Sequence, residues 1–158
     1  MSSQVLSEQT SHVSAFVALL RAHAAATRRL NVQLLADHGL TLSDFEVLLR
    51  LARASDMRMR RVDLAEQVFL TASGVTRLLD GLERSGLVER GSCSTDRRVV
   101  YAVLTQSGLD RLQGAAASHF AQIEELFGEH FDAGEVDELT ALLDRLGEGT
   151  TEECAPPS

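Results

Sequence analysis

Five polar side chains recur between residues 71 and 85 at a spacing that places them on one side of a helix: Ser73, Thr76, Arg77, Asp80 and Arg84. Separations of three, four and seven residues bring side chains to a common helix face. The opposite side is apolar, with Val75, Leu78, Leu79 and Leu82. The pattern predicts an amphipathic helix that packs one face on a core and offers the other, with its hydroxyls and guanidinium groups, to base edges and phosphates in a major groove.

A second basic group follows, at the tip of a predicted β-hairpin. Residues 87–90 and 98–104 are rich in β-formers, and the turn-prone residues 91–96 lie between them. Arg98 suits a narrow minor groove, where the negative potential is strong. We expect the carboxylate of Asp96 to orient the Arg98 guanidinium through a bidentate contact, and Arg97, on the other face of the strand, to reach phosphate.

Local signals place the elements that carry these groups. We expect a helix over 7–37 ended by Gly39, a helix over 44–54 opened by a capping box of Ser43 and Glu46, an extended piece over 57–60, and a helix over 62–69. Thr71 should cap the helix over 71–85, and Gly86 should end it.

Two further helices are expected after the hairpin. Thr105 is a suitable N-cap for a long helix through Phe127, and Asp132 with Glu135 forms a capping box for a last helix that ends near Gly147. The fold class is therefore mainly α with a small β-wing. The expected organisation is an N-terminal dimerisation helix (1–40), a winged helix-turn-helix DNA-binding module (41–105), C-terminal dimerisation helices (106–147) and a disordered tail (148–158).

The formal net charge of −8 is unevenly distributed along the 158 residues. Residues 112–158 hold eleven acidic residues against Arg145 alone, whereas residues 77–98 hold five arginines. Because a steering field depends on where the charges lie, the acidic total does not exclude nucleic acid as the partner.

The terminal helices carry long apolar stripes, which a module of about 65 residues cannot cover. Phe16 and Leu20 belong to the first stripe, and Leu139 and Leu143 to the last. An uncovered stripe indicates a partner surface, and a homodimer is the simplest partner. Two-fold symmetry would also place two reading helices roughly 34 Å apart, in successive major grooves.

The order and spacing of several motifs resemble the MarR family of winged helix-turn-helix regulators over nearly the whole chain. The motifs are Leu40-Thr41 with Phe45-Glu46-Val47-Leu48, Asp63-Leu64-Ala65-Glu66, Val75-Thr76-Arg77-Leu78-Leu79-Asp80, Gly86-Leu87-Val88-Glu89-Arg90, Asp96-Arg97-Arg98 and Leu104-Thr105 with Gly108. The resemblance implies a homodimer on a pseudo-palindromic operator, usually as a repressor. It also implies a possible small-molecule effector between the dimerisation helices and the reading module.

The resemblance also assigns roles to single residues. Ser73, Thr76 and Arg77 lie where relatives touch bases and phosphates, and Arg98 lies where the wing enters the minor groove. We expect Thr71, Gly74, Arg84, Arg90 and Arg97 at phosphates. Two alternatives stay open: Gly74 is equally compatible with a tolerated small residue, and Arg84 and Arg90 with solvated charge.

Other classes of function have weaker support. The chain shows no nucleophile elbow, phosphate loop or catalytic carboxylate pair, and its histidines and cysteines lack metal-ligand spacing, so we expect no enzyme, no metal and no cofactor. Neither a membrane span nor a signal peptide is expected, which favours the cytoplasm. A winged helix that binds protein instead of DNA, and a redox-responsive regulator that uses Cys93, are the remaining alternatives.

Overall fold

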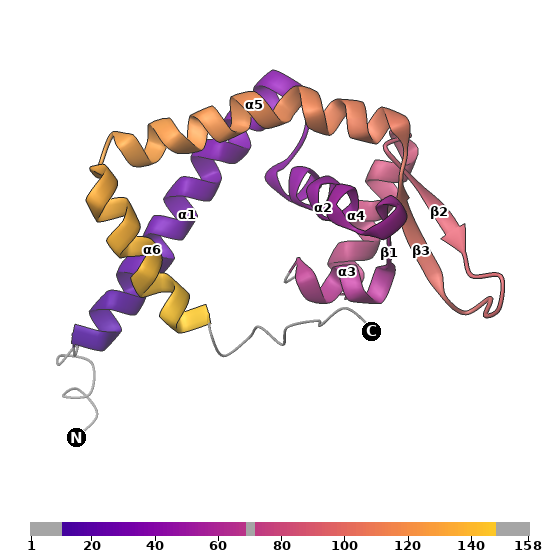
Figure 1. Cartoon of the computed structure of the whole chain (residues 1–158), viewed down its shortest axis with the longest axis horizontal. Helices are drawn as coiled ribbons and strands as arrows, with labels where there is room; N and C mark the ends of the chain where they lie inside the picture. The colour runs from indigo at the N-terminus through magenta and orange to yellow at the C-terminus, as the bar shows by residue number, and fades with distance from the viewer. Residues whose placement is uncertain (1–10, 69–71, 148–158) are drawn as a thin grey trace. The chain divides into compact units, whose positions relative to one another are not determined.

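The computed structural model describes residues 11–68 and 72–147, which form six α-helices and three short strands (Figure 1). The helices are α1 (Ser11–His38), α2 (Leu42–Arg53), α3 (Arg61–Gln67), α4 (Ala72–Arg84), α5 (Gln106–Gly128) and α6 (Ala133–Gly147). The strands are β1 (Arg58–Arg60), β2 (Val88–Ser92) and β3 (Val100–Leu104), and a 3₁₀ turn (Ser55–Met57) precedes β1. The predicted fold class is confirmed. The tail predicted for 148–158 lies outside the described residues.

The chain divides into two compact units, and the division falls within α5, between His119 and Phe120. The first unit contains α1 to α4, the strands and the first part of α5. Its core is a single apolar cluster to which α2, α3, α4 and β2 contribute Leu48, Leu64, Leu79 and Val88, all at most 2% exposed. The same cluster includes Leu34 of α1 and Ala115 of α5, so the first unit is built around one shared core, which makes it a rigid support for surface side chains.

The start of α2 differs from the expected one. The N-cap is Thr41, whose hydroxyl accepts a hydrogen bond from the Asp44 amide at 3.0 Å, while the Asp44 carboxylate accepts one from the Thr41 amide at 2.8 Å. The capping box expected at Ser43 and Glu46 is therefore wrong by two residues. Both pairs have the spacing of a capping box. The pair of Thr41 and Asp44 forms it, because Leu42, one residue before Ser43, is already helical.

The three strands form one antiparallel sheet in the order β1-β3-β2. In the hairpin of β2 and β3, Val88 pairs with Leu104 and Ser92 with Val100. On the other edge of β3, Arg58 of β1 pairs with Val103. The hairpin projects away from α2, α3 and α4 (Figure 1). The sequence predicted the hairpin and an extended β1, but not that β1 would join the same sheet.

The end of α4 has the predicted form. Gly86 has a φ of +72°, and the Leu87 amide donates to the Leu82 carbonyl at 3.0 Å, as does the Gly86 amide to the Glu83 carbonyl. This pair of bonds defines a Schellman motif, in which the left-handed residue favours glycine. The motif turns the chain directly from α4 into β2, so this helix and the hairpin are joined by a short, fixed link.

A histidine is buried in the first unit where α5 meets α2. His119 is 3% exposed, and the centroid of its ring lies 4.5 Å from the centroid of the Phe45 ring. Nearby, Nε2 of His38 and the Ser118 hydroxyl are 2.6 Å apart. Burial, and to a smaller extent the charge of His38, lowers the pKa of His119 below its ordinary value, so the neutral ring is favoured.

The second unit holds the end of α5 and the whole of α6. As predicted, Asp132 and Glu135 form a reciprocal capping box at the start of α6, with both hydrogen bonds at 2.9 Å. Leu142 and Leu146 of α6 are 50% and 73% exposed. In neither unit does a described helix combine the length and the apolar character that crossing a bilayer requires.

Candidate nucleic-acid interface

Helix α4 presents the three predicted base-reading side chains together on its outer face. Ser73, Thr76 and Arg77 are exposed, whereas Val75 and Leu79 on the opposite face are 2% and 0% exposed. The buried face fixes the rotation of the helix about its axis, because turning it would expose the leucines and valine. The fixed rotation in turn determines which side chains meet a ligand. The expected common face is confirmed.

Two arginines from outside α4 hold this helix in place through two of its carboxylates, Asp80 and Glu83. Arg61 of α3 contacts Glu83 Oε1 with Nη2 at 2.8 Å, and Arg90 of β2 contacts Glu83 Oε2 with Nε at 3.2 Å. The same arginines lie 3.7 and 3.6 Å from Asp80 Oδ1. We call these four residues the arginine brace. It links the helix before α4, α4 itself and the wing.

The arginine brace changes two expectations from the sequence. The three-residue spacing of Arg77 and Asp80 on one helix favours an ion pair between them, but in the structure Asp80 forms ion pairs with Arg61 and Arg90. Arg90 was expected at a phosphate, and its guanidinium is engaged by Glu83. No local pattern predicts either pairing, since the partners come from different elements. The one hint was that Asp80 and Glu83 share a helix face.

The wing tip is a hydrogen-bonded turn that exposes Arg97 and Arg98. The Val99 amide donates to the Asp96 carbonyl at 3.2 Å, and the Arg98 amide donates to Asp96 Oδ1 at 2.9 Å. Asp96 therefore fixes Arg98 through the backbone, whereas a contact with its guanidinium was expected. The two arginines also occupy the turn and not the strand, so the expected alternation between strand faces does not apply to them.

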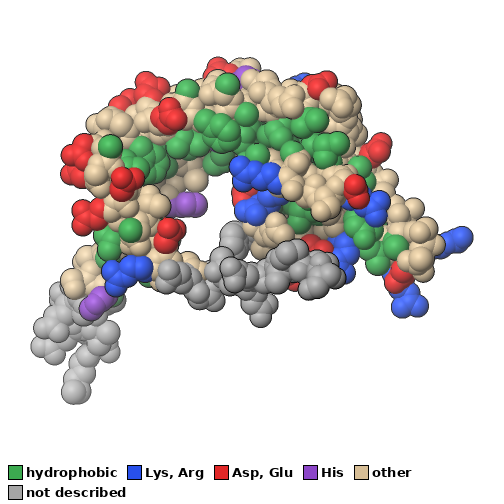
Figure 2. Space-filling model, viewed as in Figure 1, with side chains coloured by type: hydrophobic (Ala, Val, Ile, Leu, Met, Phe, Trp, Pro, Cys, Tyr) green, Lys and Arg blue, Asp and Glu red, His purple; other side chains and the backbone are tan. Residues whose placement is uncertain are grey.

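Arginine side chains gather at the far end of the hairpin, where Figure 2 shows them in blue. Arg84, at the end of α4, is also exposed, and Gly74 in its first turn is half-buried. Arg77, Asp80, Glu83 and Arg84 together line one shallow hollow. Thr71, expected at a phosphate, lies outside the described residues. Helix α4 and the wing thus offer separate cationic groups to a polyanion.

Cys93 lies at the entry to the wing tip and is half-buried. Its Sγ is 3.1 Å from the Thr95 hydroxyl. Hydrogen bonds from the side chain and then the backbone of Thr95 lower the pKa of the Cys93 thiol, and a lower pKa raises the thiolate fraction near neutral pH. The described residues contain no cluster of three or more histidine, cysteine or acidic side chains that could hold a metal.

Comparison with known proteins gives consistent matches. The family model described as the MarR family matches residues 40–100. The regulator MhqR of Bacillus subtilis (strain 168), an HTH-type transcriptional regulator, is 30% identical over 132 residues, which cover 84% of this chain and 88% of MhqR. The HTH-type transcriptional repressor YetL of the same organism is 34% identical over 113 residues, 72% of this chain and 67% of YetL.

The chain is also similar in structure to a protein that was solved in complex with DNA. A MarR variant from Escherichia coli, crystallised with operator DNA, superposes with a TM-score of 0.76 at 25% identity, covering 89% of this chain and 99% of that one. The similarity includes the helices on both sides of the matched module, because the coverage extends well beyond residues 40–100.

Proposed function

This chain belongs to the MarR family of transcriptional regulators, and we propose that it acts as a homodimer that binds a pseudo-palindromic operator and represses the adjacent genes. The family consists of regulators and not enzymes, in line with what we expected. One observation carries the proposal: α4 exposes Ser73, Thr76 and Arg77 on one face while its other face is locked into the core.

We assign Ser73, Thr76 and Arg77 to the major groove. The guanidinium of Arg77 can donate two parallel hydrogen bonds to O6 and N7 of guanine, which is the commonest specific contact between a side chain and a base in that groove. The hydroxyls of Ser73 and Thr76 can donate or accept and so suit either base edges or phosphates. Arg77 should therefore carry most of the sequence preference.

The wing and the ends of α4 would add contacts that position the protein. Arg98, presented by the Asp96 turn, is assigned to the minor groove. Arg97 and Arg84, both exposed, and the backbone at Gly74 near the start of α4 are assigned to phosphates. Arg90 is assigned mainly to the arginine brace, because its guanidinium already contacts a carboxylate.

The dimer is supported by apolar side chains left exposed in each unit. On α1, Phe16 and Leu20 are 60% and 52% exposed, and on α6, Leu146 is 73% exposed. Exposed apolar surface of this kind marks a contact with another protein surface. The proposed organisation keeps residues 1–40 and 106–147 for dimerisation and residues 41–105 for DNA.

The repressor role is supported by the name of the relative YetL. Release of the protein from its operator by a small molecule is supported by the family resemblance. A regulator of this kind acts where the chromosome is, so we place it in the cytoplasm. The competing proposal is a winged helix that binds protein alone.

Sedimentation and DNA titration test this proposal together. A dimer at micromolar concentration, with operator affinity that falls linearly on a log–log plot against salt, supports it, since each phosphate contact contributes a slope of about −0.9. A monomer, or a duplex affinity that salt does not change, would support the protein-binding alternative.

A further inference from the structure

The outer face of the three-stranded sheet carries an arginine stacked on an aromatic ring. The guanidinium carbon of Arg58 in β1 lies 4.3 Å from the centroid of the Tyr101 ring in β3. Arg58 pairs with Val103, two residues along β3 from Tyr101, so the two side chains share one face of the sheet. A cation within about 6 Å of a ring centroid is attracted by the negative face of the ring. The contact therefore joins β3 of the hairpin to β1.

Gly91 of β2 leaves room for this arrangement on the other side of β3. It pairs with Tyr101, and a Cβ atom placed on it would lie 2.9 Å from Cγ2 of Val103 and 3.3 Å from Cβ of Tyr101. Both distances are shorter than the optimal separation of carbon atoms, about 3.5 to 4.0 Å. A larger residue at 91 would thus displace Val103 or Tyr101. Glycine weakens a strand interior, so its presence here marks close packing on this face.

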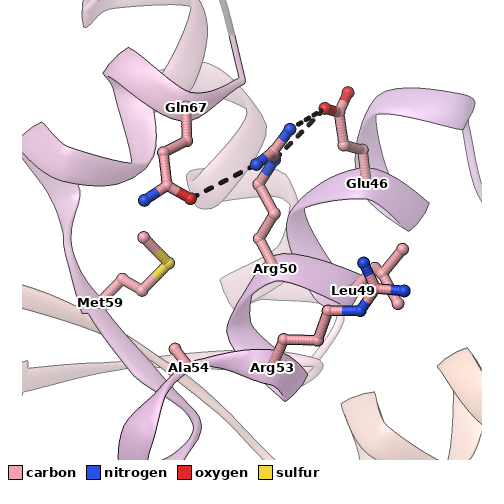
Figure 3. A pocket seen from close by; sticks show the side chains of 7 residues that line it. All are labelled: Glu46, Leu49, Arg50, Arg53, Ala54, Met59 and Gln67. Carbon is pink, nitrogen blue, oxygen red and sulfur yellow. Dashed lines mark hydrogen bonds and ion pairs between the residues drawn. The ribbon is translucent and has the colours of Figure 1, made fainter. Parts of the chain in front are cut away.

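Strand β1 is itself fixed to the rest of the first unit. Nε and Nη2 of Arg60 each donate at 2.7 Å to a carboxylate oxygen of Asp63 in α3, which makes a bidentate pair. Met59, which precedes Arg60, faces the other way, packs against the apolar core and lines a cavity between α2, β1 and α3, beside Arg53 (Figure 3). Because β1 is anchored on both faces, it gives Arg58 a fixed base.

The stack ties down the hairpin close to its tip. One further pair of strand residues lies between Tyr101 and the turn that carries Arg98. Arg90, in the arginine brace, precedes Gly91 in β2 and therefore points to the opposite face of the sheet. The arginine brace and the stack thus hold opposite faces of the hairpin.

A hairpin tied on one face alone can bend toward the other, and bending moves its tip. We propose that Arg58 is a positioning residue for the wing, which acts through Tyr101 to set where Arg98 meets DNA. The effect on DNA rests on the proposed function, whereas the effect on the hairpin does not.

Tyrosine fluorescence of the full-length protein without DNA tests the stack. Tyr101 is the only tyrosine and the chain has no tryptophan, so the emission reports on this ring alone. We expect acrylamide to quench it more steeply in Arg58→Ala, because the side chain that covers one face of the ring is lost. Arg53→Ala removes an exposed arginine that no dashed line reaches in Figure 3, and as the matched control it should quench as the unaltered protein does. Equal quenching in all three proteins would overturn the proposal.

Amide hydrogen exchange measures how firmly the hairpin is held. We expect the paired amides of β3 to exchange about two- to fivefold faster in Arg58→Ala, the size of a cation–π contact at an exposed site. Arg58→Lys keeps a cation over the ring and should restore most of the protection. Tyr101→Phe keeps the ring and should exchange as the unaltered protein does, whereas Tyr101→Leu should match Arg58→Ala. Unchanged exchange in Arg58→Ala, or equal acceleration in Tyr101→Phe and Tyr101→Leu, would refute the role of the stack.

Operator titrations then test what the stack does for the wing. We expect Arg58→Ala to weaken operator binding about two- to fivefold with an unchanged log–log salt slope, since no phosphate contact is lost. In an Arg98→Ala background the same change should have no further effect, because Arg58 acts through the wing tip. A slope less steep by about 0.9 would make Arg58 a phosphate contact, and losses that add in the double variant would show that it acts elsewhere. Either result would overturn its positioning role.

The measurements with and without DNA separate this proposal from the proposed function. Operator binding by a protein whose hairpin exchanges equally in Arg58→Ala would overturn the stack alone. Faster exchange in Arg58→Ala, in a protein that ignores DNA, would leave the stack standing and overturn the proposed function.

Discussion

The Nε atom of Arg90 in the wing lies 3.2 Å from Oε2 of Glu83 in α4, so the two parts of the proposed DNA-binding surface are tied by an ion pair. Glu83 is shared with Arg61, whose side chain is only 18% exposed. The reading helix is therefore held from both sides. The spacing between α4 and the wing is set by the protein before any nucleic acid binds.

The salt dependence of operator binding separates bracing from phosphate contact at Arg90. An exposed ion pair contributes about 0 to 1 kcal/mol, and the Arg90 side chain is 58% exposed, so Arg90→Met should weaken operator binding only modestly. Its log–log salt slope should stay unchanged. In Arg84→Met, which serves as the comparison, the slope should become less steep by about 0.9, because one phosphate contact is lost. If the slope in Arg90→Met became as shallow as in Arg84→Met, Arg90 would be assigned to a phosphate contact instead.

The role of Asp96 is tested by a change of charge at constant shape. Asp96→Asn keeps an oxygen that can accept from the Arg98 amide, and should bind the operator as the unaltered protein does. Asp96→Ala loses the acceptor, and the turn should lose about 0.5 to 1.5 kcal/mol. Fluorescence anisotropy with labelled operator measures both variants. If Asp96→Asn were as weak as Asp96→Ala, the negative charge and not the turn would be what Arg98 requires.

Loss of the Arg77 guanidinium should change sequence preference as well as affinity. Arg77→Ala should cost about 1 to 3 kcal/mol on the preferred operator and much less on unrelated duplex, because a base contact is lost along with a positive charge. Equal losses on specific and unrelated DNA would make Arg77 a phosphate contact.

Stability should fall as the pH drops below the ordinary pKa of histidine, about 6.5. Burial lowers the pKa of His119 in the folded chain, so the unfolded chain takes up a proton first as the pH falls. The contribution of His119 is fully present above about pH 6.5 and is lost progressively down to its lowered folded pKa. Urea unfolding at pH 7.5, 6.5 and 5.5 should show this loss, and His119→Leu should reduce it. The same pH profile in both proteins would exclude His119 as its source.

Elements whose signals are local were predictable from the sequence. Gly86 needs only the preceding helix to define its turn, and Asp132 and Glu135 cap α6 with atoms three residues apart. The outer face of α4 followed from its apolar spacing, which is a property of that segment alone. The three side chains assigned to the major groove lie on this face, and the family resemblance singled them out from the five polar residues there.

Interactions between elements were not predictable, because one sequence fixes no distances across the fold. Nothing near Arg61 or Arg90 indicates that both meet Glu83, and the cavity beside Arg53 depends on how β1 and α3 pack against α2. At Thr41, two capping pairs competed within three residues, and the spacing rule could not rank them. The sequence correctly indicated a hydrogen bond between Asp96 and Arg98, but the donor is the Arg98 backbone amide and not its guanidinium.

Selection of bound duplexes from a random pool tests the central claim, that two joined copies read DNA with paired α4 helices. We expect an enriched motif made of two inverted half-sites, with centres about one helical turn, roughly 34 Å, apart, and loss of the motif's strongest base preference in Arg77→Ala. A motif without two-fold symmetry, or a pool that stays random in low-salt buffer, would contradict the account.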